Sequence, residues 1–422
     1  MLHDFSTGGS ERIAIRLANR WADSGRRVTL FCGTEQGAAR ALVSPAVHVE
    51  MCQPETVRSP WSRLQLGWRL AKQVRFHSPD IVFSPGNFHM IVLAILARTG
   101  FAKRPVFLSK LSNPIRRSGF RRRVERVADA MIRTVARPVD GLIAMSPAMG
   151  DEARLVFGSN RVIEILEPVL DDETAAPVRI ASPHAGPLII AAGRLCAQKD
   201  FMTALRAFAL LPASLAARLL ILGEGPLRPA LQREGERLNI ADRLEMPGHV
   251  SDVLPYFAQA DLLVMTSRYE GYPAVLIEAI AAGLPIVTTD CSLAIREVIP
   301  ADCFGTVVNS RDPIAIAAAI NDQLKRPRAD RTRIDAHVDR HRIGASAKAY
   351  LELFDRMATC ENSLDVASSH HGRFPLDGSR RQTSARRGLG GQRAPIGTSW
   401  SMARDFPCWW RLLNFATRNS AR

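Results

Sequence analysis

The sequence lacks the features that would place it among secreted or membrane proteins. Its seven cysteines are odd in number and form no C-x-x-C pair, which favours a reducing compartment over a disulfide framework. The longest apolar run, FHMIVLAILA, is about half of the roughly 18–20 residues that a membrane span needs. The opening MLHDFSTGGSER contains no apolar signal-peptide core. These absences predict a cytoplasmic protein.

Charge is distributed unevenly along the chain. Residues 1–170 carry 25 Lys/Arg and 14 Asp/Glu, residues 171–359 carry 21 and 23, and residues 360–422 carry 10 and 4. A basic first half favours an anionic partner such as lipid headgroups, nucleic acid or an acidic glycan. Because no recognisable nucleic-acid-binding module accompanies the charge, we do not expect a nucleic-acid partner.

Short β-rich runs alternate with helical runs in both halves of the 422 residues, a length that predicts two domains. The runs are RVTLF, VHVEM, DIVFS, PVFLS, GLIAMS and VIEIL in the first half, then LIIAAG, RLLILG, DLLVMT, LPIVTT and GTVVN. This rhythm predicts an α/β fold with two doubly wound Rossmann-like domains that face each other across a cleft. The predicted divisions are domains at 1–170 and 171–340, a helix at 341–359 and a disordered basic tail at 360–422.

Two acids eight residues apart mark the segment SRYEGYPAVLIEAIAAGLPIV. Glu270 falls in the loop after a strand and Glu278 in the following helix, which Pro273 should open and Gly283 should end. The amides at Tyr272–Val275 would face an anion such as phosphate. The two carboxylates could then accept hydrogen bonds from a sugar on one side and a ribose on the other.

Cations for a diphosphate follow an earlier strand in AAGRLCAQKD. Gly193 allows the chain to turn close to a ligand. Arg194 can bind phosphate with its planar fork, and Lys199 as a point charge. The nearby LGEGPLR lacks the third glycine of a dinucleotide fingerprint, so it is weak support for NAD binding. His249 and Val250 could present backbone groups to a nucleobase.

These motifs together resemble the family 4 (group 1) retaining glycosyltransferases with the GT-B fold, over about residues 8–358. The resemblance implies that Arg194 and Lys199 bind the donor diphosphate, that Glu270 faces the donor sugar and that Glu278 holds the ribose. It also assigns Gly8 and Gly9 to the family's amino-terminal glycine loop. It implies metal-independent transfer of a sugar from a nucleotide-diphosphate sugar to a hydroxyl, with retention of configuration.

The expected site follows from these assignments. Its catalytic residues are Glu270, Arg194 and Lys199, and no metal ligand or cofactor is expected. The expected donor-binding residues are Gly8, Gly9, Gly193, Arg194, Lys199, His249, Val250, Glu270, Gly271, Tyr272, Pro273, Ala274, Val275 and Glu278. The acceptor would be a glycan or a lipid-linked glycan in cell-surface polysaccharide or glycolipid synthesis.

Two departures from the family concern the first domain. Many members carry a histidine after a first-domain strand, where this chain has PVFLSKLSNPI, and Ser112 and Asn113 could substitute for it as hydrogen-bonding groups. His89 lies past another strand end, but a histidine at the start of an apolar helix is more often structural. The family also begins with a strand before the glycine loop, and only seven residues precede Gly8. We therefore expect the first strand to be missing, and the reading frame to continue upstream by roughly 5–20 residues that include a strand-length apolar run.

The segment from Arg116 to Arg137 holds eight arginines with apolar residues interleaved. Such a basic amphipathic helix suits an anionic membrane surface, and an ordinary helix with a solvated face is an equal alternative. The membrane reading predicts peripheral attachment to the inner face of the cytoplasmic membrane. Another GT-B enzyme such as a sugar-nucleotide epimerase, or a catalytically impaired nucleotide-sugar-binding homologue, remain alternatives for the function.

Overall fold

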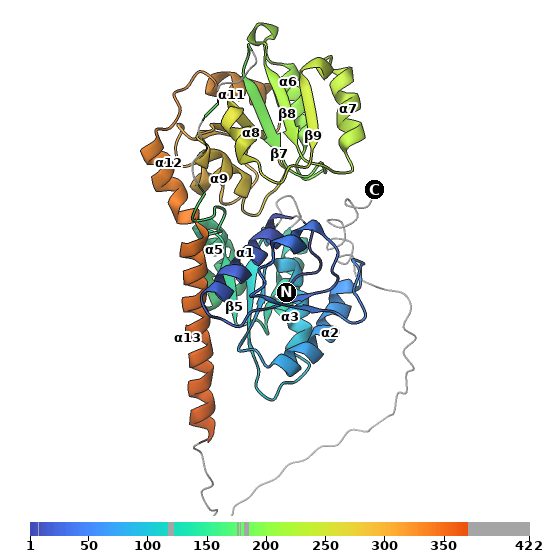
Figure 1. The fold of residues 1–422 in the computed structure, drawn as a ribbon, viewed down its shortest axis with the longest axis vertical. Helices are drawn as coiled ribbons and strands as arrows, with labels where there is room; N and C mark the ends of the chain where they lie inside the picture. Colours follow the sequence, from blue (N-terminus) through green and yellow to red (C-terminus); the bar gives the residue numbers. More distant parts are fainter. Residues whose placement is uncertain (7, 117–121, 175–176, 178, 181–184, 370–422) are drawn as a thin grey trace, which may run out of the picture.

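The computed structural model describes residues 1–6, 8–116, 122–174, 177, 179–180 and 185–369. Two α/β domains lie end to end, and the second connects back to the first through one long helix (Figure 1). All the strand pairings of the named sheets are parallel. The predicted GT-B arrangement of two doubly wound domains is confirmed.

The second domain is built on a six-stranded sheet in the order β12-β11-β10-β7-β8-β9. Its strands are β7 Leu188–Ala192, β8 Arg218–Leu222, β9 Leu244–Gly248, β10 Leu262–Met265, β11 Ile286–Thr289 and β12 Gly305–Val308. Its helices are α6 Phe201–Ala209, α7 Arg228–Arg237, α8 Leu254–Gln259, α9 Ala274–Ala281, α10 Ile295–Val298, α11 Pro313–Gln323 and α12 Arg331–Val338. The strand order reverses between β7 and β10, and ligands bind at such switch points in doubly wound sheets.

The first domain contains a two-stranded sheet, β1-β2, and a four-stranded sheet, β3-β4-β5-β6. The strands are β1 Thr29–Cys32, β2 His48–Met51, β3 Ile81–Ser84, β4 Val106–Leu111, β5 Gly141–Ala144 and β6 Val162–Glu164. The helices are α1 Gly9–Asp23, α2 Ser62–His77, α3 Met90–Leu96, α4 Arg122–Ala136 and α5 Pro147–Phe157. Each β-rich run predicted from the sequence thus forms a strand.

The first residues of the chain lie between these two sheets. Leu2 forms a parallel bridge with Cys32 of β1 and donates to the carbonyl of Phe31 at 2.8 Å. On the other side, the Met1 amine donates to the carbonyl of Phe83 in β3 at 3.1 Å. No named strand precedes α1 among the described residues. A short extended segment, with Leu2 and Phe5 buried, takes the place of such a strand between β1 and β3.

Helix α13 (Ile343–Ser369) leaves the second domain and packs on the first. Its Tyr350 and Phe354 form edge-on ring contacts with Trp21 of α1, at 5.6 and 5.1 Å between centroids. The helix continues through 360–369, where the sequence predicted a disordered tail, and residues 370–422 lie outside the described residues. Among the described residues, no helix has the length and apolarity needed to cross a bilayer.

The chain crosses between the domains at two adjacent points. The amides of Val169 and Leu170 donate to the carbonyl of His341, and the amide of Ile343 donates back to Leu170. The His341 ring is fully buried, 3.4 Å from the Tyr272 hydroxyl, so it joins a second-domain loop to the crossing. Burial, and then the neighbouring Arg340, lower the pKa of His341 to about 4.

This lowered pKa predicts acid sensitivity at the crossing. In the unfolded chain a histidine has a pKa of about 6.5, so between pH 6.5 and 4 the unfolded state binds a proton that the folded state does not. The contribution of His341 to the free energy of unfolding should therefore be complete above pH 6.5 and fall by about 2 kcal/mol by pH 5. Urea unfolding of wild type and His341→Gln at pH 7.5 and 5 measures this effect, because the free energy of unfolding should fall more between the two pH values in wild type than in the variant. Parallel pH dependence in the two proteins would exclude this role for His341.

Candidate active site

A cleft of about 1780 Å³ lies between the domains, at the carboxyl ends of the second-domain strands. Every residue of the predicted donor-binding set lines it: Gly8, Gly9, Gly193, Arg194, Lys199, His249, Val250, Glu270, Gly271, Tyr272, Pro273, Ala274, Val275 and Glu278. The donor-binding residues predicted from the sequence come from both domains, and in the structure they line one cavity.

The loop after β7 is packed so closely that it requires glycine at two positions. Gly193 has a positive φ of +146°, and Gly223, at φ +140°, lies so near that a Cβ there would be 2.0 Å from the Gly193 carbonyl oxygen. Any larger residue at either position would be strained or would clash. Both glycines line the cleft, so the two closely packed turns form part of its wall.

The loops after β7 and β10 hold each other in place. The Arg268 amide donates to the Gln198 carbonyl at 2.8 Å, and the Gln198 side chain donates to the Tyr269 carbonyl at 3.0 Å. The Thr266 hydroxyl adds a bond to the Asp200 carbonyl at 2.9 Å. This cross-bonding fixes the two loops that carry the predicted catalytic residues.

Lys199 and Glu270 form an ion pair across these loops. The Lys199 Nζ lies 2.8 Å from Glu270 Oε1, with the carboxylate side chain 10% exposed and the lysine 20%. The Glu270 amide is anchored to the Cys291 carbonyl at 2.7 Å. Arg194 is exposed in the cleft, and within the described residues it has no ion-pair partner. Of the two cations predicted to bind the diphosphate, Lys199 is therefore paired and Arg194 is uncompensated.

Helix α9 begins and ends close to the positions predicted from the sequence. Pro273 is the residue before its first turn rather than within it, and Gly283 follows its end at φ +71°. The Ala274 amide donates to Tyr272 at 2.9 Å, so it is not free as expected. The amides of Tyr272 and Val275 have no acceptor among the described residues, and both residues line the cleft.

Glu278 lies on the cleft side of α9, in a largely apolar setting. Burial raises the pKa of its carboxyl, and the positive charges of Arg12 and Arg16 on α1 act in the opposite direction. Arg16 is committed to the Val169 carbonyl and Asp171 near the domain crossing. Arg12 lines the cleft and, within the described residues, has no ion-pair partner. It is a second-domain-facing cation that the sequence analysis missed.

The first domain approaches the Glu270 loop through its backbone. A Cβ on Gly271 would lie 1.9 Å from the Ser112 carbonyl oxygen, so glycine is required for this contact. The Ser112–Asn113 turn is held by Asn87, which accepts from the Asn113 amide at 3.0 Å and donates to its carbonyl at 2.8 Å. Ser112 and Asn113 line the cleft, and their substitution for the family's histidine stays a prediction.

A histidine does line the cleft, from a different first-domain strand. His89 follows β3, and burial, followed by nearby cations, lowers its pKa to about 3, so the ring is neutral at physiological pH. Glu167, which also lines the cleft, pairs with Lys110 of β4 at 2.8 and 2.9 Å, and both side chains are almost fully buried. A lysine inside the apolar run PVFLSKL was a signal that could have revealed this pair.

Two family profiles match the chain, one on each domain. The family described as "Glycosyl transferase 4-like domain" matches residues 8–168, and "Glycosyl transferases group 1" matches residues 186–326. The chain belongs to the group 1 glycosyltransferases. Glu270, Glu278, Arg194 and Lys199 all lie within the residues that match the group 1 profile.

Sequence relatives of this glycosyltransferase include curated bacterial enzymes. The lipopolysaccharide core biosynthesis glycosyltransferase LpsE of Rhizobium meliloti is 24% identical over 291 residues, which cover 68% of this chain and 77% of LpsE. The GDP-mannose-dependent alpha-(1-6)-phosphatidylinositol dimannoside mannosyltransferase of Mycobacterium tuberculosis is 35% identical over 150 residues, which cover 35% of this chain and 38% of that enzyme.

Solved structures share the fold at low identity. The lipopolysaccharide outer core galactosyltransferase WaaB in its apo form aligns with a TM-score of 0.62 at 17% identity, covering 84% of this chain and all of WaaB. Anabaena HepE in complex with UDP-glucose aligns with a TM-score of 0.62 at 18% identity, covering 86% of this chain and 99% of HepE. These likenesses establish the two-domain architecture independently of the site residues.

Proposed function

We propose that the enzyme transfers a sugar from a nucleotide-diphosphate sugar to a hydroxyl of a glycan or lipid-linked acceptor, with retention of configuration. The observation that carries the proposal is the Lys199–Glu270 pair beside the uncompensated Arg194, at the amino end of α9. This arrangement offers two cations and backbone amides to a diphosphate, and a carboxylate to the sugar next to it.

In the proposed reaction, the bond between the anomeric carbon and the diphosphate oxygen breaks while the acceptor hydroxyl attacks from the same face. The departing phosphate oxygen takes the acceptor proton, so no enzyme nucleophile is needed. Arg194 and Lys199 stabilise the negative charge that develops on the leaving diphosphate, which is electrostatic preorganisation. We propose that this step uses these residues without a metal ion in the cleft.

The setting of the reaction is supported by the relatives. LpsE is named for lipopolysaccharide core biosynthesis, and the mycobacterial relative for a phosphatidylinositol dimannoside. An acceptor in cell-surface polysaccharide or glycolipid synthesis, met at the cytoplasmic face of the membrane, suits both names. Because the structure of HepE was solved with UDP-glucose, UDP and UDP-glucose are the first probes to use here.

The two acids provide the test of this proposal. Glu278→Ala should weaken binding of free UDP about tenfold or more. It removes a carboxylate that accepts hydrogen bonds from the ribose, and a hydrogen bond to a charged group contributes about 1.5–3 kcal/mol. Glu270→Ala should leave UDP affinity within a few-fold and reduce transfer from UDP-glucose, because its partner is the sugar. Calorimetry with UDP and a product assay on UDP-glucose separate the two effects.

Asp290→Ala, another acid that lines the cleft, serves as the control for loss of a carboxylate there. If Glu270→Ala and Glu278→Ala change nucleotide affinity and turnover in the same proportion, the division of roles is wrong. Analysis of the product's anomeric configuration tests retention directly, and an inverted product would contradict the proposed same-face attack.

Membrane attachment through Arg116–Arg137 also stays a proposal, and fewer of its arginines are available to lipid headgroups than the sequence predicted. Arg116 is paired with Asp129 at 2.6 Å, and Arg133 donates to the Val156 carbonyl at 2.6 Å, so neither is free for lipid. Arg126 and Val127 of α4 are exposed. Residues 117–121 lie outside the described residues.

Replacing Arg121, Arg122, Arg123 and Arg126 with glutamine should reduce sedimentation with anionic vesicles, at about 1 kcal/mol for each basic residue near the surface. Salt should mimic the change, because it screens exposed charges. A control of equal charge change on the second domain uses Arg206, Arg233, Arg237 and Lys325, all exposed. If the α4 variant and the control sediment alike, α4 is an ordinary solvated helix.

A further inference from the structure

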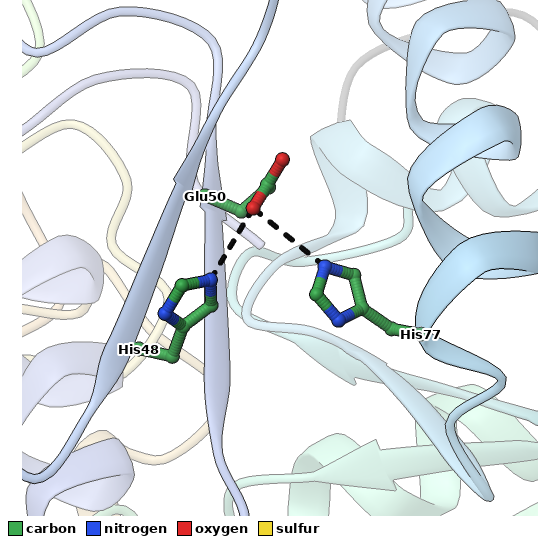
Figure 2. A group of neighbouring side chains, drawn as sticks. All are labelled: His48, Glu50 and His77. Atoms are coloured by element: carbon green, nitrogen blue, oxygen red, sulfur yellow. Dashed lines mark hydrogen bonds and ion pairs between the residues drawn. The ribbon is translucent and has the colours of Figure 1, made fainter.

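Two histidines and a glutamate converge on the first domain, between β2 and α2. Figure 2 shows the carboxylate of Glu50 with the ring of His48 on one side and the ring of His77 on the other. One ligand atom from each residue lies within 4.8 Å of the other two. We propose that these three side chains bind a divalent transition-metal ion of the zinc type.

Local structure explains why the three residues meet. His48 and Glu50 are two apart on β2, so their side chains project from the same face of the strand. His77 is the last residue of α2, where the carbonyl ends of the helix favour positive charge. The strand thus supplies two ligands and the helix end supplies the third, together with a favourable field.

The distances suit a metal ion better than an ion pair. Zinc binds histidine nitrogen at about 2.0–2.1 Å and carboxylate oxygen at about 2.0–2.2 Å, which sets neighbouring ligands of a tetrahedral site about 3.4 Å apart. Glu50 Oε2 lies 3.3 Å from His48 Nε2 and 3.6 Å from His77 Nε2. Both separations are longer than a charge-assisted hydrogen bond, which is about 2.7–2.9 Å.

Two further contacts point to a prepared site. The Gln73 side chain donates to Glu50 Oε1 at 3.0 Å, which orients the other carboxylate oxygen towards the two rings. The Nε2 of His77 is buried and has no hydrogen-bond partner within the described residues. A bound cation would satisfy this nitrogen, since a buried polar atom without a partner is costly.

The ligand types select the ion. Two imidazoles and one carboxylate suit zinc, cobalt, nickel or copper, whereas magnesium and calcium prefer oxygen alone. Three protein ligands leave a fourth position for water, and the 60% exposed His48 side chain keeps the site open to solvent. None of the three residues lines the transfer cleft. The ion would therefore join β2 to the end of α2 outside the transfer cleft, with one coordination position open to water.

The experiment uses the full chain without an affinity tag, stripped of metal with a chelator. Titration with Co²⁺ should produce visible absorption bands that saturate at one equivalent, and Zn²⁺ should displace the cobalt. Zn²⁺ should raise the melting temperature because an ion that binds the folded state stabilises it, and Mg²⁺ at the same concentration should not. His48→Ala and His77→Ala should each weaken Co²⁺ binding at least tenfold, and Glu50→Gln should weaken it as well.

His370 and His371, which are neighbours in the sequence, provide the matched control for the loss of histidine side chains. Their replacement by alanine should leave the cobalt spectrum and the affinity unchanged. The melting temperature of each variant without metal shows that it is folded. The proposal is overturned if wild type gives no saturable cobalt spectrum, if His48→Ala and His77→Ala bind like wild type, or if the His370/His371 variant loses binding. If the histidines and Glu50 only form weak ion pairs and bind no metal, the wild-type protein will give no saturable cobalt spectrum.

Discussion

Replacing Lys199 with alanine is expected to lower kcat/KM for sugar transfer about 100-fold, and Arg194→Ala at least about 10-fold. Charge-assisted hydrogen bonds contribute about 1.5–3 kcal/mol, and removing a donor that acts on developing negative charge costs about 2.7–4 kcal/mol. Lys199 should have the larger effect because it is 20% exposed and held against Glu270, whereas Arg194 is exposed in the cleft. UDP affinity by calorimetry and kcat/KM with UDP-glucose measure the two effects.

Arg206→Ala is the matched control for the loss of a cation from the second domain. Arg206 is exposed, pairs with Glu234 at 2.8 Å and does not line the cleft. Lys199→Ala also leaves the buried Glu270 carboxylate without its cation, so the double variant Lys199→Ala/Glu270→Gln shows how much of the loss comes from that unpaired charge. Unchanged UDP affinity in both Lys199→Ala and Arg194→Ala would remove the diphosphate site from these residues.

The second large effect concerns stability. Lys110→Met is expected to lower the free energy of unfolding by about 3–5 kcal/mol, because it leaves the Glu167 carboxylate buried without its partner. The two side chains are 1% and 5% exposed, so water cannot compensate for the loss. The double variant Lys110→Met/Glu167→Gln should recover part of the stability, because no buried charge remains. Urea unfolding followed by circular dichroism gives the three values.

An exposed pair of the same chemistry sets the scale. Lys103 lies 3.0 Å from Asp80, with side chains 54% and 67% exposed. Lys103→Met should change stability by less than about 1 kcal/mol, as is typical of surface ion pairs. If Lys103→Met and Lys110→Met lower the free energy of unfolding equally, burial does not increase the contribution of the Lys110–Glu167 pair to stability.

Much of the architecture was predictable because it depends on local patterns. The apolar runs of the second domain are too short for helices and are separated by helical periods, so they could form only strands of a parallel sheet. Glu270, Glu278, Arg194 and Lys199 were predictable because each follows a strand, and strand ends of parallel sheets meet at one edge. The glycine at 283 marked the end of α9 for the same local reason.

Contacts between distant segments were not predictable from local patterns. The partner of Lys110 is 57 residues away in the sequence, and no periodicity links the two. Arg12 belongs to a helix of one domain and acts on Glu278 of the other. His48 and Glu50 lie two apart in the predicted strand VHVEM, which places both on one face, but only the tertiary structure shows that His77 completes the cluster.

The packing of α13 means that the first domain is not a contiguous stretch of the chain. Residues 1–170 supply its sheets, but Trp21 and Phe83 close their aromatic cluster only against Tyr350 and Phe354, which follow the second domain in the sequence. A ribosome must therefore complete the second domain before the first can finish folding. Cleavage of the chain between Asp172 and Leu188 would not separate two free domains, because the carboxyl-terminal fragment would still hold α13 against the amino-terminal one. The enzyme could on this basis be reassembled from two complementary fragments.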